Sequence, residues 1–245
     1  VAKVKPINIG GVIVSNATLH NEDEIKRKDI RVGDTVKIER AGDVIPHVIE
    51  VDKTKRKKNT KSFLFPRKCP SCGSETIKDF NKVTKKFDAV RRCINDGFTC
   101  ERIAIEKIKH FISKEALNID GLGKKVVEKF WDLKLINKPQ DIFNLNYSKI
   151  ERFEGWGKLS TDNLRRSIEK SKNVSLHRFI YALGIRHIGN ENAKLISENV
   201  VNISDFIQII KTNNFHKFSN INGIGETQIN SLKSFFSNKL NLSVL

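Results

Sequence analysis

IDGLGK, at residues 119–124, is the first of four related stretches that decide the fold of more than half of the chain. The other three are FEGWGK at 153–158, IRHIGN at 185–190 and INGIGE at 221–226. Their last glycines follow one another after 34, 32 and 36 residues: Gly123, Gly157, Gly189 and Gly225. This spacing is typical of a repeated unit of helix, tight turn and helix.

Apolar residues flank each copy at helical spacing. Before the first copy, Ile105, Ile108 and Phe111 would share one face of a helix, and Val127 and Phe130 would do so after it. In the turn, an apolar residue lies between glycines. The first glycine can therefore take a positive φ while the apolar residue holds the turn against its own helices. The sequence predicts four helix-hairpin-helix motifs.

The predicted motif offers a binding site for phosphate. Its second helix begins at the last glycine, where the backbone N–H groups have no intrahelical acceptor. They point outward and can bind a phosphate oxygen without reading the base sequence. A single Gly-apolar-Gly turn also ends ordinary helices, but four in register on a basic chain favour DNA as the ligand.

The four copies differ in charge. Lys124 and Lys158 follow the last glycine in the first two copies, whereas Glu226 follows it in the fourth and would repel a phosphate. Arg186 lies inside the third copy, where His187 replaces the first glycine. We therefore rank the first two copies highest as DNA contacts and interpret the fourth as a packing unit. The predicted DNA-binding residues of the hairpins are Gly121, Gly123, Lys124, Gly155, Gly157, Lys158, Arg186, Gly189, Gly223 and Gly225.

The composition points to a polyanionic partner. The 245 residues carry 45 Lys and Arg against 28 Asp and Glu, a net charge of +17, so nucleic acid is the leading candidate. A basic amphipathic membrane binder is the alternative, but no apolar run approaches the roughly 20 residues of a membrane span. Without a recognisable signal peptide, we expect a cytoplasmic protein. Methionine is absent even at position 1, so we expect part of a longer protein.

Residues 1–60 are predicted to form a small β-barrel of the OB type. Short Val- and Ile-rich runs at 7–9, 12–14, 36–38 and 44–51 are separated by turn signals such as Gly10-Gly11. An OB-fold, a partly open barrel that binds oligonucleotides, fits this pattern. The basic run KTKRKK at 53–58 is interpreted as a solvated linker, which would still favour nearby phosphates.

The only four cysteines of the chain predict a structural zinc site. Cys69 and Cys72 form a CPSC knuckle, and Cys93 and Cys100 supply a second pair. Four thiolates make the tetrahedral cage that zinc prefers and leave no position for a reactive water. Disulfides are disfavoured because no export signal is visible, and a redox CxxC would leave the second pair unexplained. His110 is a weaker candidate ligand.

Together the patterns predict a multidomain protein. A small β-barrel occupies 1–60, a four-cysteine zinc module 61–103, and an all-α helix-hairpin-helix array with four motifs 104–245.

Several longer stretches resemble one known family. NATLHN at 16–21, RAGDVIP at 40–46, CPSCG at 69–73, DGLG at 120–123 and ALGIR at 182–186 look like signatures of bacterial NAD-dependent DNA ligase, in the same order as in its C-terminal half. The resemblance covers essentially the whole chain, and ATLHN and RAGDVIP are far more specific than any hairpin.

The resemblance implies the DNA-binding part of a ligase. The family transfers AMP from NAD to a lysine and then to the 5′-phosphate of a nick, where the 3′-hydroxyl displaces it. That chemistry needs an adenylation domain with a Lys-x-Asp-Gly motif, but neither Asp-Gly dipeptide here, at 96–97 and 120–121, has the lysine. We therefore expect no catalytic residue in this chain. NAD and Mg²⁺ would act only through an adenylation domain, in cis or in trans.

By resemblance, the barrel lies in the minor groove and the hairpins hold phosphates on the far side, so that a monomer encircles nicked double-stranded DNA during replication and repair. Lys37 and Arg40 would contact phosphate, and Asp43 would fix its loop. Ser15 stands where many relatives have arginine, so one backbone contact would be lost. Val1 would fall inside the barrel, which would leave it N-terminally truncated.

The resemblance also implies a bacterial, cytoplasmic and nucleoid-associated protein. The alternative is a free-standing DNA-binding repair or accessory module, or one half of a split ligase that acts in trans.

Overall fold

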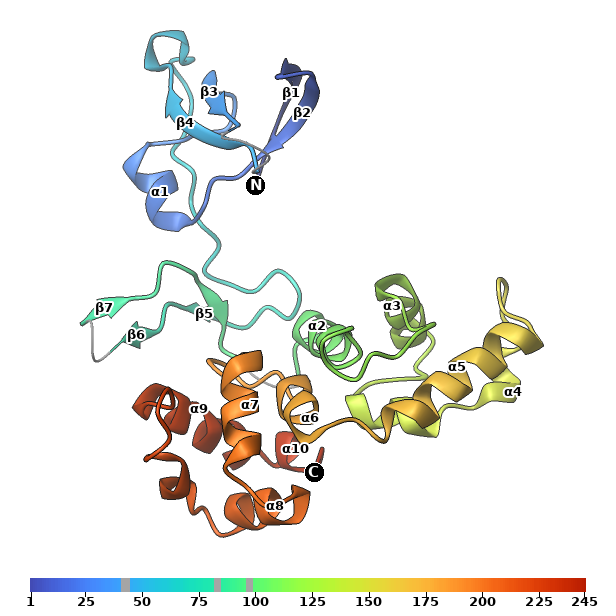
Figure 1. Cartoon of the computed structure of the whole chain (residues 1–245). Helices are drawn as coiled ribbons and strands as arrows, with labels where there is room; N and C mark the ends of the chain where they lie inside the picture. Colours follow the sequence, from blue (N-terminus) through green and yellow to red (C-terminus); the bar gives the residue numbers. More distant parts are fainter. Residues whose placement is uncertain (41–44, 82–84, 96–98) are drawn as a thin grey trace. The chain divides into compact units, whose positions relative to one another are not determined.

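The computed structural model describes residues 1–40, 45–81, 85–95 and 99–245. Contacts within the chain group them into two compact units, Val1–Ile94 and Asn95–Leu245. Figure 1 shows that the first unit carries the β-strands and that the second is built of helices. The finer division predicted at residues 60 and 103 stays a prediction.

Two antiparallel ribbons form the first part of the β-unit. β1 (Ala2–Ile9) pairs with β2 (Val12–Ala17), and β3 (Val36–Glu39) pairs with β4 (His47–Val51). The first ribbon reverses at Gly10 and Gly11, which both have positive φ, as a primed two-residue hairpin turn requires. Strands are therefore present at the predicted runs 7–9, 12–14 and 36–38, and in the last run from His47 onward, while Val44 lies outside the described residues.

Thr18 joins the two ribbons. Its N–H donates to the carbonyl of Pro46 at 2.7 Å, and its carbonyl accepts from the N–H of Val48 at 3.3 Å. A parallel bridge between Thr18 and His47 results. The two ribbons and the helix that follows share one small core of Ala17, Ile25, Ile30 and Val48.

That helix, α1 (Glu22–Arg27), is not predicted by the sequence analysis, because EDEIKR has one apolar residue and shows no helical spacing. Asn21 caps it by accepting from the N–H of Glu24 at 3.0 Å. The Glu22 carboxylate is buried at its start and accepts from Lys26 Nζ at 2.7 Å and from Arg91 Nε at 3.1 Å. The hydrogen bond from Lys26, followed by that from Arg91, outweighs the burial and lowers the pKa of Glu22 to about 2.

The basic run at 53–58 is more than a solvated linker. η1 (Lys53–Lys55) leads to Arg56, whose side chain is only 13% exposed. Its guanidinium donates to both carboxylate oxygens of Asp34, at 2.9 and 2.8 Å, and to Asp29 Oδ2 at 2.5 Å. Burial opposes ionisation of Asp34, but these hydrogen bonds still lower its pKa. The interpretation as a solvated linker is therefore wrong at Arg56, because two carboxylates that lie far away in the sequence bind it.

A second pair of short ribbons follows in the same unit. β5 (Thr76–Ile77) pairs with β8 (Arg92–Cys93), and β6 (Phe80–Asn81) pairs with β7 (Lys86–Phe87). Arg91, between β7 and β8, donates both to Glu22 of α1 and to the carbonyl of Thr76 at 2.8 Å. The ribbon pair is thereby fixed to α1.

The second unit contains the four hairpins. The first pair of hairpins comprises α2 (Glu101–Phe111), α3 (Lys124–Asp132), η2 (Pro139–Asn144), α4 (Tyr147–Ile150) and α5 (Lys158–Ser171). The second pair comprises α6 (Leu176–Ala182), α7 (Asn190–Glu198), α8 (Ile203–Lys211), η3 (Phe215–Phe218) and α9 (Glu226–Ser237), followed by α10 (Lys239–Leu242). In the part of the chain that the structure describes, no helix is long and apolar enough to cross a membrane.

Each hairpin pair has its own hydrophobic core. The core of the first pair contains Ile108, Val127, Phe130, Leu164 and Ile168, all fully buried. That of the second pair contains Ile180, Ala193, Ile196, Phe206 and Leu232, which are also fully buried. Apolar positions predicted from helical spacing lie in both cores. The four repeats therefore pack as two pairs.

Candidate nucleic-acid interface and metal centre

The reversal in each hairpin depends on one left-handed residue. Gly121, Gly155 and Gly223 have φ of +89°, +81° and +94°, a conformation that glycine adopts without steric cost. His187 takes the equivalent place in the third turn with φ +62°. The turn geometry predicted from the glycines is therefore present in all four copies.

The apolar residue in the middle of each turn faces the core. Leu122, Ile188 and Ile224 are 2%, 4% and 4% exposed. Trp156 is half-buried and packs on Phe130 of α3, with 5.5 Å between the ring centroids. These side chains hold the turns against the helices, so the glycines on either side stay at the surface.

The last glycine of each turn is the N-cap of the next helix. Gly123, Gly157, Gly189 and Gly225 have extended backbones and precede α3, α5, α7 and α9. The first intrahelical bond of α3 is donated by Val126, to the carbonyl of Gly123 at 2.9 Å. The N–H groups at the start of each helix lie ahead of such bonds, as a phosphate site at a helix N-terminus requires.

At three of these N-caps, the structure of the described residues does not require a glycine. Their backbones are extended, which any residue can adopt, and a Cβ built on Gly123, Gly157 or Gly189 would meet no atom within 4 Å. Ser, Asp or Asn would cap the helices at least as well. The described residues leave the space open, so an external group can approach the backbone closely at these positions.

The two hairpins of the first pair pack reciprocally. The N–H of Asp120, in the first turn, donates to Ser167 Oγ of α5 at 2.7 Å. In return, Lys129 Nζ of α3 donates to the carbonyl of Glu154, in the second turn, at 3.2 Å. Each turn therefore rests on the second helix of the other copy, which fixes the N-termini of α3 and α5 relative to one another.

The second pair repeats this arrangement with different residues. His187 Nδ1, in the third turn, lies 2.9 Å from Ser231 Oγ of α9. In the fourth turn, a Cβ on Gly223 would come within 3.0 Å of Leu195 Cδ1 of α7. In this pair too, each turn lies against the second helix of the other copy.

The two pairs differ in the charge at the N-termini of their helices. The first two positions of α3 are the exposed lysines Lys124 and Lys125, and α5 begins at the exposed Lys158. By contrast, α7 has Glu191 in its first turn and α9 begins at Glu226. Arg186, in the third turn, is also exposed. The cations that can face a phosphate are therefore concentrated in the first pair.

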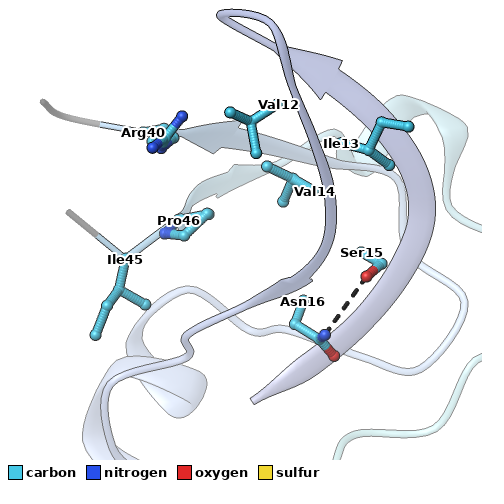
Figure 2. A pocket seen from close by; sticks show the side chains of 8 residues that line it. All are labelled: Val12, Ile13, Val14, Ser15, Asn16, Arg40, Ile45 and Pro46. Carbon is cyan, nitrogen blue, oxygen red and sulfur yellow. Dashed lines mark hydrogen bonds between the residues drawn. The ribbon is translucent and has the colours of Figure 1, made fainter. Parts of the chain in front are cut away.

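The predicted phosphate contacts of the barrel belong to the first unit. Lys37 of β3 is exposed, and its Nζ is 3.5 Å from Glu50 Oε1 of β4. Arg40 lines an open groove of about 330 Å³ with residues of β2 and with Ile45 and Pro46 (Figure 2). Asn16 donates weakly to Ser15 Oγ at 3.5 Å in the same groove. Asp43 lies outside the described residues.

The four predicted metal ligands come together. The sulfur atoms of Cys69, Cys72, Cys93 and Cys100 all lie within 4.8 Å of one another, and those of Cys72 and Cys93 are 3.5 Å apart. Zinc–sulfur bonds of about 2.3 Å in a tetrahedron place sulfurs a little under 4 Å apart, so the cluster fits a structural zinc ion. None of the four cysteines is in a disulfide.

Local backbone geometry builds this cluster. In the CPSCG turn, Gly73 has φ +72° and its N–H donates to the carbonyl of Cys69 at 2.9 Å. Cys93 lies on β8, and the buried Cys100 is the N-cap of α2. His110 is held elsewhere, because its Nε2 lies 2.7 Å from the carbonyl of Tyr181, so it is not one of the clustered ligands.

Two residues with a role at the candidate sites are absent from the sequence-based prediction. Lys125 adds a second cation at the start of α3. The Lys-Lys dipeptide after the last glycine could have indicated this residue. Ser160 accepts from the N–H of Gly157 and donates to its carbonyl, both at 2.9 Å, and so fixes the start of α5. A serine three residues after an N-cap is the signal that could have indicated this second residue.

Open glycine N-caps on two hairpin pairs, together with a small β-structure and a four-sulfur cluster in the same chain, define a multidomain protein of the nucleic-acid-binding type. Comparison with known proteins makes the class more specific. Residues 1–60 match the NAD-dependent DNA ligase OB-fold domain, and residues 178–245 match the helix-hairpin-helix motif. The second match covers the second pair of hairpins; the first pair shares its turn geometry.

Similar curated proteins are DNA ligases of bacteria. The chain is 69% identical over its whole length to the DNA ligase of Pelagibacter ubique, 47% to that of Rickettsia bellii and 41% to that of Parvibaculum lavamentivorans. It spans about a third, 36%, of the length of each of these relatives. The chain therefore matches, over its whole length, part of bacterial DNA ligases, and its first 60 residues match the OB-fold domain of the NAD-dependent type. The resemblance and the fold class predicted from the sequence are therefore confirmed.

Proposed function

We propose that this chain is the DNA-binding C-terminal portion of an NAD-dependent DNA ligase and holds nicked duplex DNA for phosphodiester bond formation in replication and repair. One observation carries this proposal. Gly123 and Gly157 leave open space at the N-termini of α3 and α5, where Lys124 and Lys158 begin the helices. A phosphate oxygen can therefore approach the unbonded N–H groups with a lysine beside it.

Reciprocal packing supports binding of two phosphates at once. Because the first turn rests on α5 and Lys129 of α3 holds the second turn, the two helix N-termini form a rigid pair. Lys37 and Arg40 would add phosphate contacts from the barrel. All these groups recognise the backbone of the duplex, so binding should depend little on base sequence.

The proposed role needs other components of a ligase. An adenylation domain, in cis or in trans, would supply the nucleophilic lysine, NAD and Mg²⁺. The four cysteines would hold one structural zinc ion with no catalytic task, because all four ligand positions are filled by protein. We place the protein as a monomer in the bacterial cytoplasm at the nucleoid, where its DNA substrate lies.

The test is a pair of double variants at the N-caps. G123D/G157D places a carboxylate where a phosphate would bind, while Asp remains a good N-cap for both helices. G123N/G157N is the matched control, with nearly the same shape and no charge. We expect G123D/G157D to weaken binding to a fluorescent nicked duplex by about 1–3 kcal/mol in total, measured by anisotropy, and by clearly more than the control.

The backbone at these positions is extended and the space around it is open, so both variants should fold. Equal affinities of the two folded variants for nicked duplex would show that the turns serve packing alone and would overturn the proposal.

A further inference from the structure

An exposed aromatic pair lies on the ribbon β6–β7 of the first unit. Phe80 and Phe87 are directly opposite each other in the strand register. Their ring centroids are 5.1 Å apart, and the ring planes are inclined by 62°. Phe80 is 50% exposed and Phe87 66% exposed, so the pair presents aromatic surface to solvent instead of filling a core.

The same ribbon is positively charged. Lys85 and Lys86 are exposed, and Lys86 stands next to Phe87 on β7. The two carboxylates of the ribbon, Asp79 and Asp88, both face Arg92, whose Nη1 is 3.8 and 2.7 Å from their nearest oxygens. Since Arg92 partly balances these carboxylates, the two lysines leave the ribbon with a net positive charge.

Exposed rings beside lysines match one kind of ligand, a chain that carries both flat aromatic groups and phosphates. Nucleic-acid strands have this composition, and stacking of bases on aromatic side chains beside a basic surface is the general mode of single-strand binding. In an intact duplex, the base faces are covered by their neighbours and only the edges are open in the grooves. A stacking surface therefore selects bases that are unpaired.

We propose that Phe80 and Phe87 form a stacking site for unpaired bases of DNA, with Lys85 and Lys86 beside the phosphates of the same strand. Such bases occur at gaps, flaps and frayed ends. This site rests on DNA being a ligand of the chain, as proposed above, but it uses a different surface and a different feature of the DNA.

The test compares two probes, a fluorescein-labelled oligothymidylate, which has no base pairs, and a blunt intact duplex of similar length. Anisotropy is measured with the full chain, the variant F80A/F87A, the conservative variant F80Y/F87Y and the control I77A/V90A. Ile77 and Val90 are exposed apolar residues of the same region, 44% and 51% exposed, so the control removes apolar surface without removing rings.

We expect F80A/F87A to weaken oligothymidylate binding by about 5- to 150-fold, which corresponds to the loss of one stacked base. Binding to the duplex should stay within about twofold, because stacking plays no part there. F80Y/F87Y keeps the rings and should bind like the unmodified protein, as should I77A/V90A. Unchanged oligothymidylate binding by F80A/F87A, or an equal loss on both probes, would overturn the proposal.

A direct signal comes from F87W. Stacking of thymine on the introduced indole should quench its emission when oligothymidylate is added, and the intact duplex should have little effect. An unchanged emission at saturating oligothymidylate would contradict the stacking site. If the unmodified protein binds duplex but not oligothymidylate, this proposal fails while the duplex-binding role stands. If it binds neither probe, the duplex-binding role fails as well.

Discussion

The two hairpin pairs have the same backbone plan but differ in the charge of the first turns of their helices. In both, a residue with positive φ makes the turn, an apolar residue packs against the core, and a glycine N-cap precedes the next helix. The first pair then has Lys124 and Lys158, whereas the second has Glu191 and Glu226 in the first turns of its helices.

We propose from this difference that turn geometry and phosphate binding are separable. Both pairs contain the glycine-apolar-glycine turn of the hairpin, with His187 in place of the first glycine in the third copy. The side chains that follow the last glycine decide whether the helix N-terminus attracts a phosphate or repels it. We therefore assign phosphate binding mainly to the first pair and packing mainly to the second.

Metal removal should have the largest effect on stability. It should affect the first pair of hairpins more than the second. Cys100 is the N-cap of α2, which belongs to the first pair. We expect one zinc ion per chain by elemental analysis. Because structural zinc sites in finger peptides contribute about 10–16 kcal/mol, chelation should unfold the segment around Cys69–Cys100 and remove amide-exchange protection at the start of α2. Protection of α7 and α9 should persist. A zinc content of zero, or equal loss in both pairs, would contradict this.

Cavities in the two hydrophobic cores should have the second-largest effect on stability. Leu164 of α5 and Leu232 of α9 are fully buried in the first and second core. L164A and L232A should each lower the free energy of unfolding by about 2–5 kcal/mol, measured by denaturant titration. Their effects on DNA should differ. Leu164 lies beneath the first turn, where its Cδ1 is 3.5 Å from a Cβ built on Gly121. L164A should therefore weaken duplex binding more than L232A. Equal weakening of duplex binding by L164A and L232A would contradict the proposed division of roles between the two pairs.

Substitution of the left-handed turn residues should have a smaller effect. G121A forces a side chain into φ +89° and should cost roughly 1–2 kcal/mol of stability. At the corresponding position of the third turn, H187G relieves the same conformation but loses the contact with Ser231. These effects oppose each other, so the change should stay within about 1 kcal/mol. Thermal unfolding of both variants checks the comparison, and a larger loss in H187G would show that the Ser231 contact dominates.

Charge conversion of the second pair should give the smallest effect. E191K/E226K places a cation in the first turn of α7 and of α9, as α3 and α5 have in theirs. We expect an increase in duplex affinity of up to about 1 kcal/mol per position, measured by anisotropy, because a repulsive carboxylate becomes an attractive cation. Weaker binding by a folded variant would mean that the carboxylates themselves help to place the DNA.

The sequence predicts the hairpins well because their geometry depends on local features. Glycine at a left-handed φ, an apolar residue after it and periodic apolar helices are all visible within one repeat. The CPSC knuckle is equally local, since it forms around Gly73, whereas Cys93 and Cys100 join it from β8 and from the start of α2. Their collection within 4.8 Å agrees with the prediction, although the metal itself and the DNA contacts stay predictions.

Long-range pairing is what the sequence does not reveal. Arg56 appears in a basic run that reads as a linker, yet it binds Asp29 and Asp34, more than 20 residues earlier. Nor does the repeat pattern show that turns rest on the helices of a neighbouring copy, because Asp120 and Ser167 are 47 residues apart. The exposed Phe80 and Phe87 likewise become a pair only through strand register.

The measurement that tests the central claim most directly is the salt dependence of nicked-duplex affinity. Each phosphate neutralised contributes about 0.9 to the slope of log affinity against log salt. K124Q/K158Q should therefore lower the slope of the unmodified protein by about 2. K194Q/K233Q removes the same charge from α7 and α9 of the second pair and should leave the slope nearly unchanged. Equal slopes for K124Q/K158Q and the unmodified protein, or an equal drop in both variants, would contradict the assignment of phosphate binding to the first pair.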